Sequence, residues 1–378
     1  MAHNFDESVT ILSSEEGIFT IDEDGCVWFH GRKCSYPCLE RINTTLYKVN
    51  IPNVQIKTMS ASPRHWVGID SLGKVWGFGN NSNQELGVNS RSVSFLEPVH
   101  IPIREEIVSV TCHYARTFFL SAHGKVYACG FNGLNKLGIP HGMIFDKKIV
   151  KTPTLIPKLK DIVHIECNSD NSIFLTESGD LYVCGTVCNP DSTNQYDTFP
   201  VIARKSRISN VKNIVCGYFH TMIQTNNDEI FIFGNTHILK EQHNPISIDI
   251  TSSVQSIYSV DNGVVLESNN TLWATKFHST LRNELYDDGF KLKNLQEFVK
   301  IEPPPGIIVD CILSRKSILV ITSEGIYQIG SSISSQHKVQ DIFYEWNCIT
   351  EEKKQYFNTS KYFRNRPKSA KSNINIRN

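Results

Sequence analysis

The sequence has no excess of charge of either sign, because 38 Lys and Arg residues balance 38 Asp and Glu residues. A chain without net charge creates no global field that would steer it to nucleic acid or to a membrane surface. Its first residues lack the apolar core of a secretory signal, and no run reaches the ~18 apolar residues that a membrane span requires. We therefore expect a soluble protein of the cytoplasm, the nucleus or both, with no membrane insertion.

Signatures of catalysis and of metal binding are also missing. Residues 68–75 nearly match a phosphate-binding loop, but they lack the hydroxyl residue after the lysine and coincide with a hairpin turn. No set of serine, histidine and acid is readable as a catalytic triad. The pairs Cys34/Cys38 and Cys184/Cys188 lack the C-x2-C spacing with a matched second pair that zinc sites use. We expect no conventional catalytic site, no metal and no cofactor.

Cysteine is present in eleven copies, yet an intracellular chain is expected to keep them as free thiols. Cys112, Cys167 and Cys216 recur at one position of a repeat, and Cys129 and Cys184 recur at another. Recurrence at a structural position predicts small buried apolar side chains rather than reactive groups.

The most prominent pattern in the sequence is a short phrase that occurs seven times: an apolar strand, a tight turn and a second strand with an aromatic residue. The copies begin at Gly17, His65, Arg116, Asn171, His220, Asn262 and Ser317. Their turn residues are Gly25, Gly73, Gly124, Gly179, Asp228, Asn270 and Gly325, separated by 42 to 55 residues. A repeat of about fifty residues is typical of a propeller or a solenoid.

The pattern inside the repeat decides between these two architectures. The apolar runs are short and alternate or are apolar throughout, which indicates strands. Another strand-like run precedes each phrase, and a run often led by proline follows it, as suits an outer edge strand. Four strands in each of seven repeats predict an all-β, seven-bladed propeller over residues 8–345. The aromatic strand should be third in its blade, with these side chains at least partly buried: Trp28, Trp76, Tyr127, Tyr182, Phe231, Trp273 and Tyr327.

Residues 351–378 differ from the repeats, since they contain eight Lys or Arg against two Glu, a local charge of +6. We expect a basic, flexible tail that lies outside the propeller. A weak contact with nucleic acid or another acidic surface, and a role in nuclear import, are the functional alternatives to a simple solvated tail.

Short connections precede each phrase and should lie together on one face of the disc. They combine acids, bases and aromatics, which are the residues of protein interfaces. Loops on a rigid scaffold commonly carry function. The candidate partner-binding residues are Glu16, Arg64, Tyr114, Asp170, Tyr218, Phe219, His220 and Asp261. At the phrase start itself, a histidine such as His65 either secures a turn by a hydrogen bond or, as the minority interpretation, acts as a base.

Residues 216–221, which read Cys-Gly-Tyr-Phe-His-Thr, resemble the repeat of the regulator of chromosome condensation family. That repeat reads roughly C-G-x-x-H-[ST], an apolar strand, a D-G turn, an aromatic strand ending in W-G, and then N-x-x-G-Q-L-G. The second repeat carries most of this pattern, and the resemblance spans about residues 8–345. The chain departs from it where the Gly-Gln pair is replaced by Gln84-Glu85 and by Asn135-Lys136.

The resemblance implies a guanine-nucleotide exchange factor for a Ran-like small GTPase. The founding member uses acidic and histidine side chains of one propeller face together with a projecting hairpin wedge. In this chain Glu16, Asp170 and Asp261 occupy the acidic slot, and residues 139–152 are a wedge candidate by position alone. The alternative is a propeller scaffold without exchange activity, because many members of the family are scaffolds. In both cases we expect a monomer that binds a protein partner.

Overall fold

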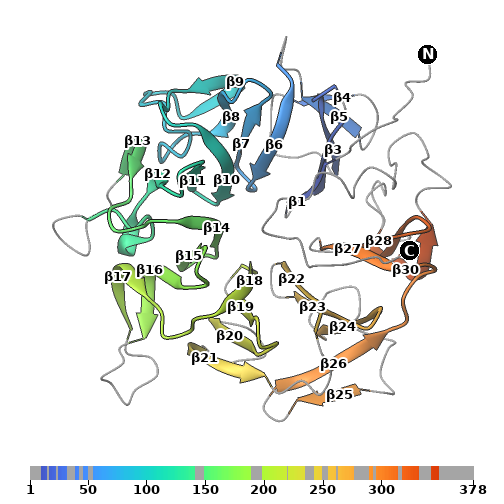
Figure 1. Cartoon of the computed structure of the whole chain (residues 1–378). Coiled ribbons are helices and arrows are strands. Elements are labelled where there is room, and N and C mark those ends of the chain that lie inside the picture. The colour runs from blue at the N-terminus through green and yellow to red at the C-terminus, as the bar shows by residue number, and fades with distance from the viewer. Residues whose placement is uncertain are drawn as a thin grey trace.

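The first strand of each phrase carries apolar side chains on both faces of its sheet. Each face must therefore be buried against a neighbouring sheet, and the arrangement of the sheets meets this requirement. The computed structural model describes residues 10–14, 17–22, 24–31, 39–41, 46–49, 54–140, 149–188, 198–218, 220–234, 242–248, 254–260, 263–275, 289–292, 295–313, 317–331 and 342–348. The expected basic tail lies outside these residues. The described part forms seven antiparallel sheets arranged around a ring (Figure 1).

Each sheet, called a blade here, is built from one continuous stretch of chain. The strands of blades 1 to 3 are β1 (Thr10–Ser14), β2 (Gly17–Ile21), β3 (Val27–Gly31), β4 (Leu39–Arg41), β5 (Leu46–Val49), β6 (Ile56–Ala61), β7 (His65–Asp70), β8 (Val75–Asn80), β9 (Ser94–Ile101), β10 (Ile107–His113), β11 (Arg116–Ser121), β12 (Val126–Phe131) and β13 (Ile149–Leu155). Blades 4 and 5 contain β14 (Ile162–Cys167), β15 (Asn171–Thr176), β16 (Leu181–Cys188), β17 (Thr198–Lys205), β18 (Val211–Cys216), β19 (His220–Thr225), β20 (Ile230–Gly234) and β21 (Gln242–Ile248). Blades 6 and 7 contain β22 (Ser256–Val260), β23 (Gly263–Ser268), β24 (Thr271–Thr275), β25 (Gly289–Leu292), β26 (Leu295–Ile301), β27 (Ile308–Leu313), β28 (Ser317–Thr322), β29 (Ile326–Ser331) and β30 (Ile342–Cys348).

The predicted all-β, seven-bladed architecture is confirmed, with one refinement. Five blades have four strands in chain order, whereas blades 1 and 6 have the orders β1-β2-β3-β5-β4 and β22-β23-β24-β26-β25. The aromatic strand is third in every blade, as its sequence predicts. The only helix in the described part is η1 (Gly133–Asn135), a single 3-10 turn, and no helix there is long and apolar enough to cross a membrane.

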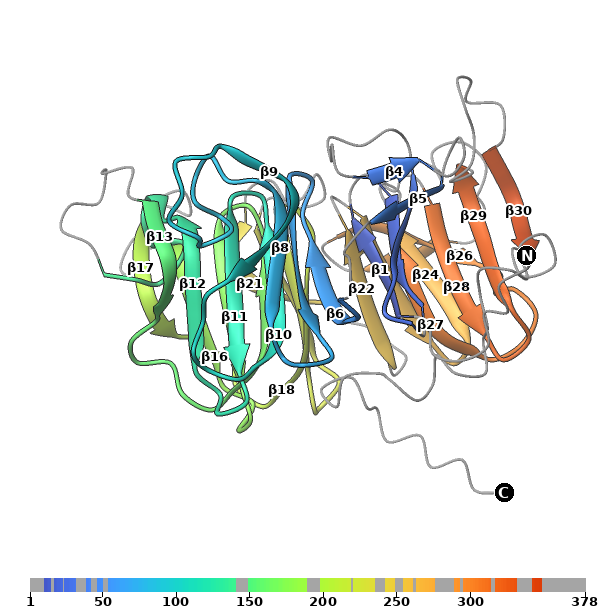
Figure 2. The same cartoon turned by 90° about the horizontal axis from the view of Figure 1, so that it is seen from above.

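The innermost strand of each blade contacts the innermost strand of the next, and β27 also contacts β1. The first and last blades are therefore neighbours in the ring, and Figure 2 shows the blades edge-on. No sheet in the described part combines strands from both ends of the chain. The outermost strands of blades 2 to 5 each contain a proline, namely Pro98, Pro153, Pro200 and Pro245. Proline at these edges leaves fewer free N–H groups for another chain to pair with.

The core lies between blades rather than inside them. All six residues of β7, β11, β15 and β19 are buried, because a neighbouring blade covers each face of these second strands. Phe118 of blade 3 packs edge-on against Phe174 of blade 4 with their ring centroids 5.6 Å apart. The largest fully buried side chains include Trp66, Phe78 and Phe118. Packing of this kind stabilises each blade only when its neighbours are present.

The aromatic residues of the third strands are mostly half-buried, which agrees with the prediction. In blade 2, a hydrogen bond to Asp70 orients the aromatic residue of the third strand, Trp76. Its carboxylate accepts hydrogen bonds from the Leu72 N–H (2.9 Å), the Lys74 N–H (2.8 Å) and the Trp76 indole N–H (2.8 Å). Asp22 binds the Trp28 indole in the same way at 2.8 Å. One acid thus closes the turn and positions the aromatic ring.

The tight turns of the repeat differ in length between blades. In blades 1 to 5 they are three-residue loops whose last residue has positive φ, such as Gly73 at φ 78°. Blade 6 has a two-residue turn, in which Asn269 and Asn270 both have positive φ. The blade 7 turn is one residue shorter than those of blades 1 to 5, because Thr322 N–H already bonds Gly325 O, and Gly325 does not have positive φ.

Candidate functional site

Three of the phrase-start residues, His65, Arg116 and His220, lie beneath one face of the ring and join consecutive blades. His65 is fully buried, with Nδ1 2.9 Å from Ser62 Oγ and Nε2 2.8 Å from Thr117 Oγ1 of blade 3. Thr117 Oγ1 donates to Glu85 O at 2.6 Å, so it must accept from Nε2–H of His65. Burial lowers the pKa of His65 to about 3, which keeps the ring neutral. His65 is therefore a structural link between blades and not a base.

The same position in blade 5 is held by His220, which is also fully buried. Its Nε2 lies 2.7 Å from Ser259 Oγ of blade 6. A residue with no exposed surface supports the face above it, but it cannot touch a docked protein in this conformation. The structure thus places His220, one of the predicted partner-binding residues, in the buried layer beneath the face.

Arg116 is the blade 3 counterpart, and it is 3% exposed. Its guanidinium donates to Ser172 Oγ (3.1 Å) and Asn168 O (2.6 Å) of blade 4, and it lies 3.3 Å from His113 Nδ1. These partners are all neutral. Burial lowers the pKa of Arg116, since a buried cation without a bonded carboxylate is poorly solvated.

Above this layer lies what we call the connection face, which comprises residues 62–64, 113–115, 168–170 and 217–218 and the loops 81–93 and 132–140. Arg64 and Tyr114 meet there across the boundary of blades 2 and 3. The Arg64 guanidinium donates to the Tyr114 hydroxyl at 3.0 Å and lies 4.5 Å from the centroid of its ring. Tyr114 is 41% exposed and has φ 47°, a conformation that is costly for a bulky side chain. A strained, exposed aromatic residue on a loop is an indicator of function.

Lys136 and Asp170 meet at the boundary of blades 3 and 4. Lys136 Nζ donates to Ser169 O at 2.8 Å and lies 3.6 Å from Asp170 Oδ1. The Lys136 side chain is 15% exposed and that of Asp170 is 45% exposed. Burial, together with the charge of Arg116, lowers the pKa of Lys136. Asp170 is thus the accessible member of the pair.

His113 lies between these groups. Its ring is 6.1 Å from that of Tyr218 in blade 5, and its Nδ1 faces Arg116. Burial, followed by the charges of Arg116 and Lys136, holds the pKa of His113 well below its usual range. A neutral His113 adds no further positive charge to the connection face at physiological pH.

Of the predicted partner-binding residues, the structure brings Arg64, Tyr114, Asp170 and Tyr218 onto the connection face of blades 2 to 5. Glu16, Phe219 and Asp261 lie outside the described residues. The sequence interpretation missed His113, Arg116 and Lys136. A signal for Lys136 was available, because it stands where the family motif has glutamine.

The other residue in that motif position is Glu85, which is fully buried. Its Oε2 accepts a hydrogen bond from Asn83 N–H at 2.7 Å, whereas its Oε1 is buried without a partner. Burial raises the pKa of Glu85. Gln84 and Asn135, which replace the glycine of the motif, have φ 61° and 58° and so keep the left-handed conformation that glycine adopts there.

We expect Glu85→Gln to stabilise the protein at alkaline pH. Because the folded state raises the pKa of Glu85, the contribution of Glu85 to stability is fully present below the unfolded pKa of ~4.3 and is lost as pH rises through the folded value. The amide cannot ionise, so the variant should gain about 1 kcal/mol in free energy of unfolding at pH 8 and much less at pH 5. Urea denaturation at both pH values measures this gain. The exposed control Glu97→Gln should show no pH-dependent difference, and an equal gain at pH 5 and pH 8 would contradict the explanation.

The cysteines whose side chains the structure describes, including Cys112, Cys129, Cys167, Cys184 and Cys216, are free thiols. Cys112, Cys129, Cys167 and Cys184 are buried, as their repeat positions predict, and Cys216 is half-buried. Burial raises the pKa of Cys112 and of Cys167 to about 12, so neither forms a thiolate near neutral pH. These side chains are part of the core.

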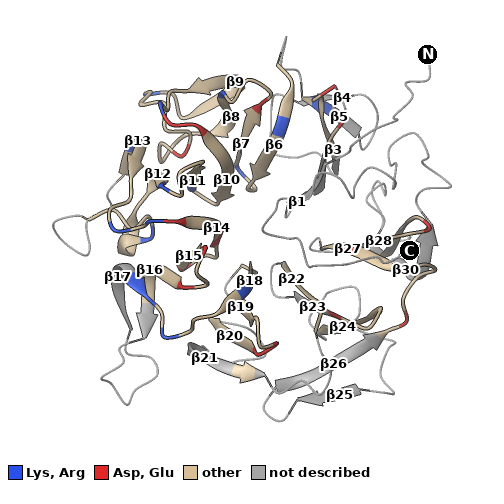
Figure 3. Cartoon of the chain, viewed as in Figure 1, with Lys and Arg blue, Asp and Glu red and all other residues tan. Residues whose placement is uncertain are grey.

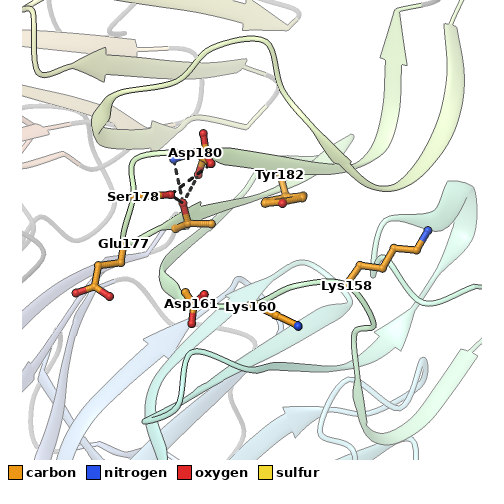
Figure 4. Close-up of a pocket in the computed structure, with 8 residues that line it drawn as sticks. Lys158, Lys160, Asp161, Glu177, Ser178, Asp180 and Tyr182 are labelled. Atoms are coloured by element: carbon orange, nitrogen blue, oxygen red, sulfur yellow. Dashed lines mark hydrogen bonds between the residues drawn. The ribbon is translucent and has the colours of Figure 1, made fainter.

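A depression of about 510 Å³ lies at the opposite face, beside the β15–β16 turn (Figure 4). Lys158 and Glu177 lie at its two ends, and Asp180 on its wall is ion-paired with Lys205 at 2.8 Å. The depression is lined by both acids and lysines, and Figure 3 shows the two signs of charge interspersed around the ring. No group of three or more His, Cys, Asp or Glu side chains in the described part is placed to hold a metal ion. The connection face is therefore the stronger candidate.

Comparison with protein families identifies the repeat. The profile of the regulator of chromosome condensation (RCC1) repeat matches residues 73–120 and 123–175. These two segments carry RCC1 repeats. Each matched segment begins at the turn between the second and third strands of one blade and ends in the second strand of the next blade. It therefore includes one of the loops 81–93 and 132–140 and the short connection before the next phrase, which are parts of the connection face. The resemblance inferred from the sequence is confirmed.

Curated relatives match only part of their own length. Protein pim1 of Schizosaccharomyces pombe is 22% identical over 253 residues, which are 60% of this chain and 46% of that protein. The human RCC1-like G exchanging factor-like protein is 26% identical over 129 residues, 30% of this chain and 27% of that protein. The chain therefore spans less than half the length of these relatives.

Solved structures with the same fold include human WBSCR16, with a TM-score of 0.65 and 16% identity over 84% of this chain and 88% of that chain. Yeast RCC1 (Prp20), crystallised with Kap60, has a TM-score of 0.63 and 15% identity over 90% of this chain and 84% of that chain. At these identities the similarity establishes the propeller fold.

Proposed function

We propose that this propeller docks a Ran-like small GTPase on its connection face and promotes release of the bound guanine nucleotide. The observation that carries the proposal is the grouping of Arg64, a strained Tyr114, Asp170 and Tyr218 on the face that the RCC1 repeats build. Relatives named as G exchanging factors, among them the human RCC1-like protein and a bovine secretion-regulating guanine nucleotide exchange factor, support this choice.

Exchange follows from thermodynamic linkage. A partner that prefers the nucleotide-free GTPase must weaken nucleotide binding by the same factor. Tyr114 and Tyr218 supply the aromatic contacts that commonly anchor protein interfaces. The exposed carboxylate of Asp170 would compete with the nucleotide phosphates for a lysine of the GTPase. Glu16 and Asp261 extend the same acidic slot in the proposal, and the wedge candidate, residues 139–152, lies largely outside the described residues.

Release of a fluorescent GDP analogue from a panel of Ran-like and related GTPases tests the proposal. We expect micromolar propeller to accelerate release at least about a hundredfold with one member of the panel, which corresponds to an activation free energy for release that is lower by ~2.7 kcal/mol. Absence of acceleration with every GTPase in the panel would reject exchange activity.

Partner capture without exchange is the second candidate. It is favoured by the similarity of 44% of this chain to human HERC3, named as a probable E3 ubiquitin-protein ligase, where the repeats are one part of a much longer protein. The same face would then retain a protein partner in a pull-down without accelerating nucleotide release. A monomeric state, a cytoplasmic or nuclear location and a contact of the basic tail with an acidic surface also remain proposals, and one plant relative is named as mitochondrial.

A further inference from the structure

Positive charge exceeds negative charge where blades 3 and 4 meet at the connection face. Arg116 and Lys136 are two basic side chains that act on each other electrostatically, and this interaction adds to burial in lowering the pKa of Lys136. Among the described residues, Asp170 is the carboxylate that acts on both. Two cations against one carboxylate leave one positive charge uncompensated in a largely buried setting, where such an imbalance is costly.

The contacts of the two cations show which of them a ligand could reach. Arg116 is 3% exposed and already donates hydrogen bonds to Ser172 Oγ and Asn168 O. It can therefore attract an anion on the connection face electrostatically but cannot contact it. Lys136 uses Ser169 O as its hydrogen-bond acceptor and lies 3.6 Å from Asp170, and its side chain keeps some exposed surface. An incoming anion would therefore meet the Lys136 ammonium.

Apolar side chains belong to the same region. Leu134, two residues before Lys136, is 38% exposed with φ 57°, and Tyr114 is 41% exposed with φ 47°. The other described non-glycine residues with positive φ are Asn, Asp, Gln or Lys, which tolerate this conformation or solvent better. The chain thus spends conformational energy to expose Leu134, two residues from Lys136, and Tyr114, which lies at the neighbouring boundary of blades 2 and 3.

We propose that Lys136, with Arg116 beneath it, receives a carboxylate side chain of the partner protein, and that Tyr114 and Leu134 receive the apolar residues beside that carboxylate. One carboxylate carries the single negative charge that balances the site. A phosphate dianion would overcompensate it and would be repelled by Asp170 more strongly than a singly charged carboxylate. The occupant is therefore a glutamate or aspartate flanked by apolar residues. This inference concerns the partner of the proposed function but does not require nucleotide exchange.

Short capped peptides test the site directly. The probes are Gly-Leu-Glu-Phe-Gly and versions with glutamine or phosphoserine in place of glutamate, titrated into the full chain by isothermal calorimetry. We expect the glutamate peptide to bind at least about tenfold more tightly than the glutamine peptide, because a charge-assisted hydrogen bond is stronger than a neutral one. Lys136→Met should remove this preference, and Lys136→Arg should retain it.

Two further variants sharpen the test. Asp170→Asn removes the competing carboxylate, so it should increase the preference for glutamate severalfold. Lys158→Met, on the opposite face, should leave it unchanged. Melting followed by circular dichroism checks that each variant is folded. Equal binding of the glutamate and glutamine peptides, a preference that survives Lys136→Met, or tighter binding of phosphoserine would each overturn the assignment. A glutamate preference without any GDP release would leave this inference standing while rejecting exchange.

Discussion

Replacing Gly130 with alanine is expected to destabilise the propeller by about 3–5 kcal/mol. Gly130 ends the aromatic strand of blade 3 with φ 103°, and a Cβ there would lie 2.2 Å from Ala115 O. That carbonyl accepts the Phe131 N–H at 2.9 Å, so neither backbone segment can move without losing the bond that ties the third strand to the connection face. Thermal unfolding should show a decrease in Tm of about 4–6 °C for a chain of this length.

Gly73→Ala is the matched control. Gly73 also has positive φ, at 78°, but a Cβ there would meet nothing within 4 Å. It should therefore cost only the conformational strain of about 1 kcal/mol. If the two variants lose equal stability, the close approach of Gly130 to Ala115 is not what requires glycine at the end of this strand.

The second large effect concerns nucleotide release. We expect Asp170→Ala to reduce the rate of propeller-stimulated GDP release from the GTPase roughly thirtyfold. This corresponds to an activation free energy that is higher by about 2 kcal/mol, because a charge-assisted contact at a desolvated interface is lost. Asp261→Ala tests the same slot in blade 6. The fold should be retained, since the Asp170 side chain is 45% exposed and contributes little to the core.

Asp180→Ala provides the control for this experiment. Asp180 is paired with Lys205 in the same blade, but it lies at the opposite face, so its loss should leave the release rate unchanged. The inferred carboxylate site makes the contrary prediction for peptide binding, where neutralising Asp170 strengthens the interaction. Unchanged GDP release by Asp170→Ala would remove this residue from the exchange mechanism, whatever the peptides show.

Local sequence was sufficient for the elements of the fold. The strand periodicity, the glycine turns and the edge prolines predicted seven repeats of four strands, and only blades 1 and 6 add a fifth strand. These features are predictable because they depend on neighbours in the chain. The three-residue turns were not foreseen, since they depend on how Asp70 and its counterparts in the other blades close each loop.

The candidate site was only partly predictable for a physical reason. The phase of the repeat placed Arg64, Tyr114, Asp170 and Tyr218 on one face, because equivalent connections in a propeller face the same way. It did not reveal that the phrase-start position is buried.

The sequence by itself thus determined the number of blades, the place of the aromatic strand in each blade and the face that carries the connections. Only the tertiary structure decided that Arg116, Lys136 and Asp170, from three separate stretches of chain, meet at one boundary with a single carboxylate for two cations. Electrostatic balance and burial depend on distances between blades, and a one-dimensional repeat carries no record of those distances.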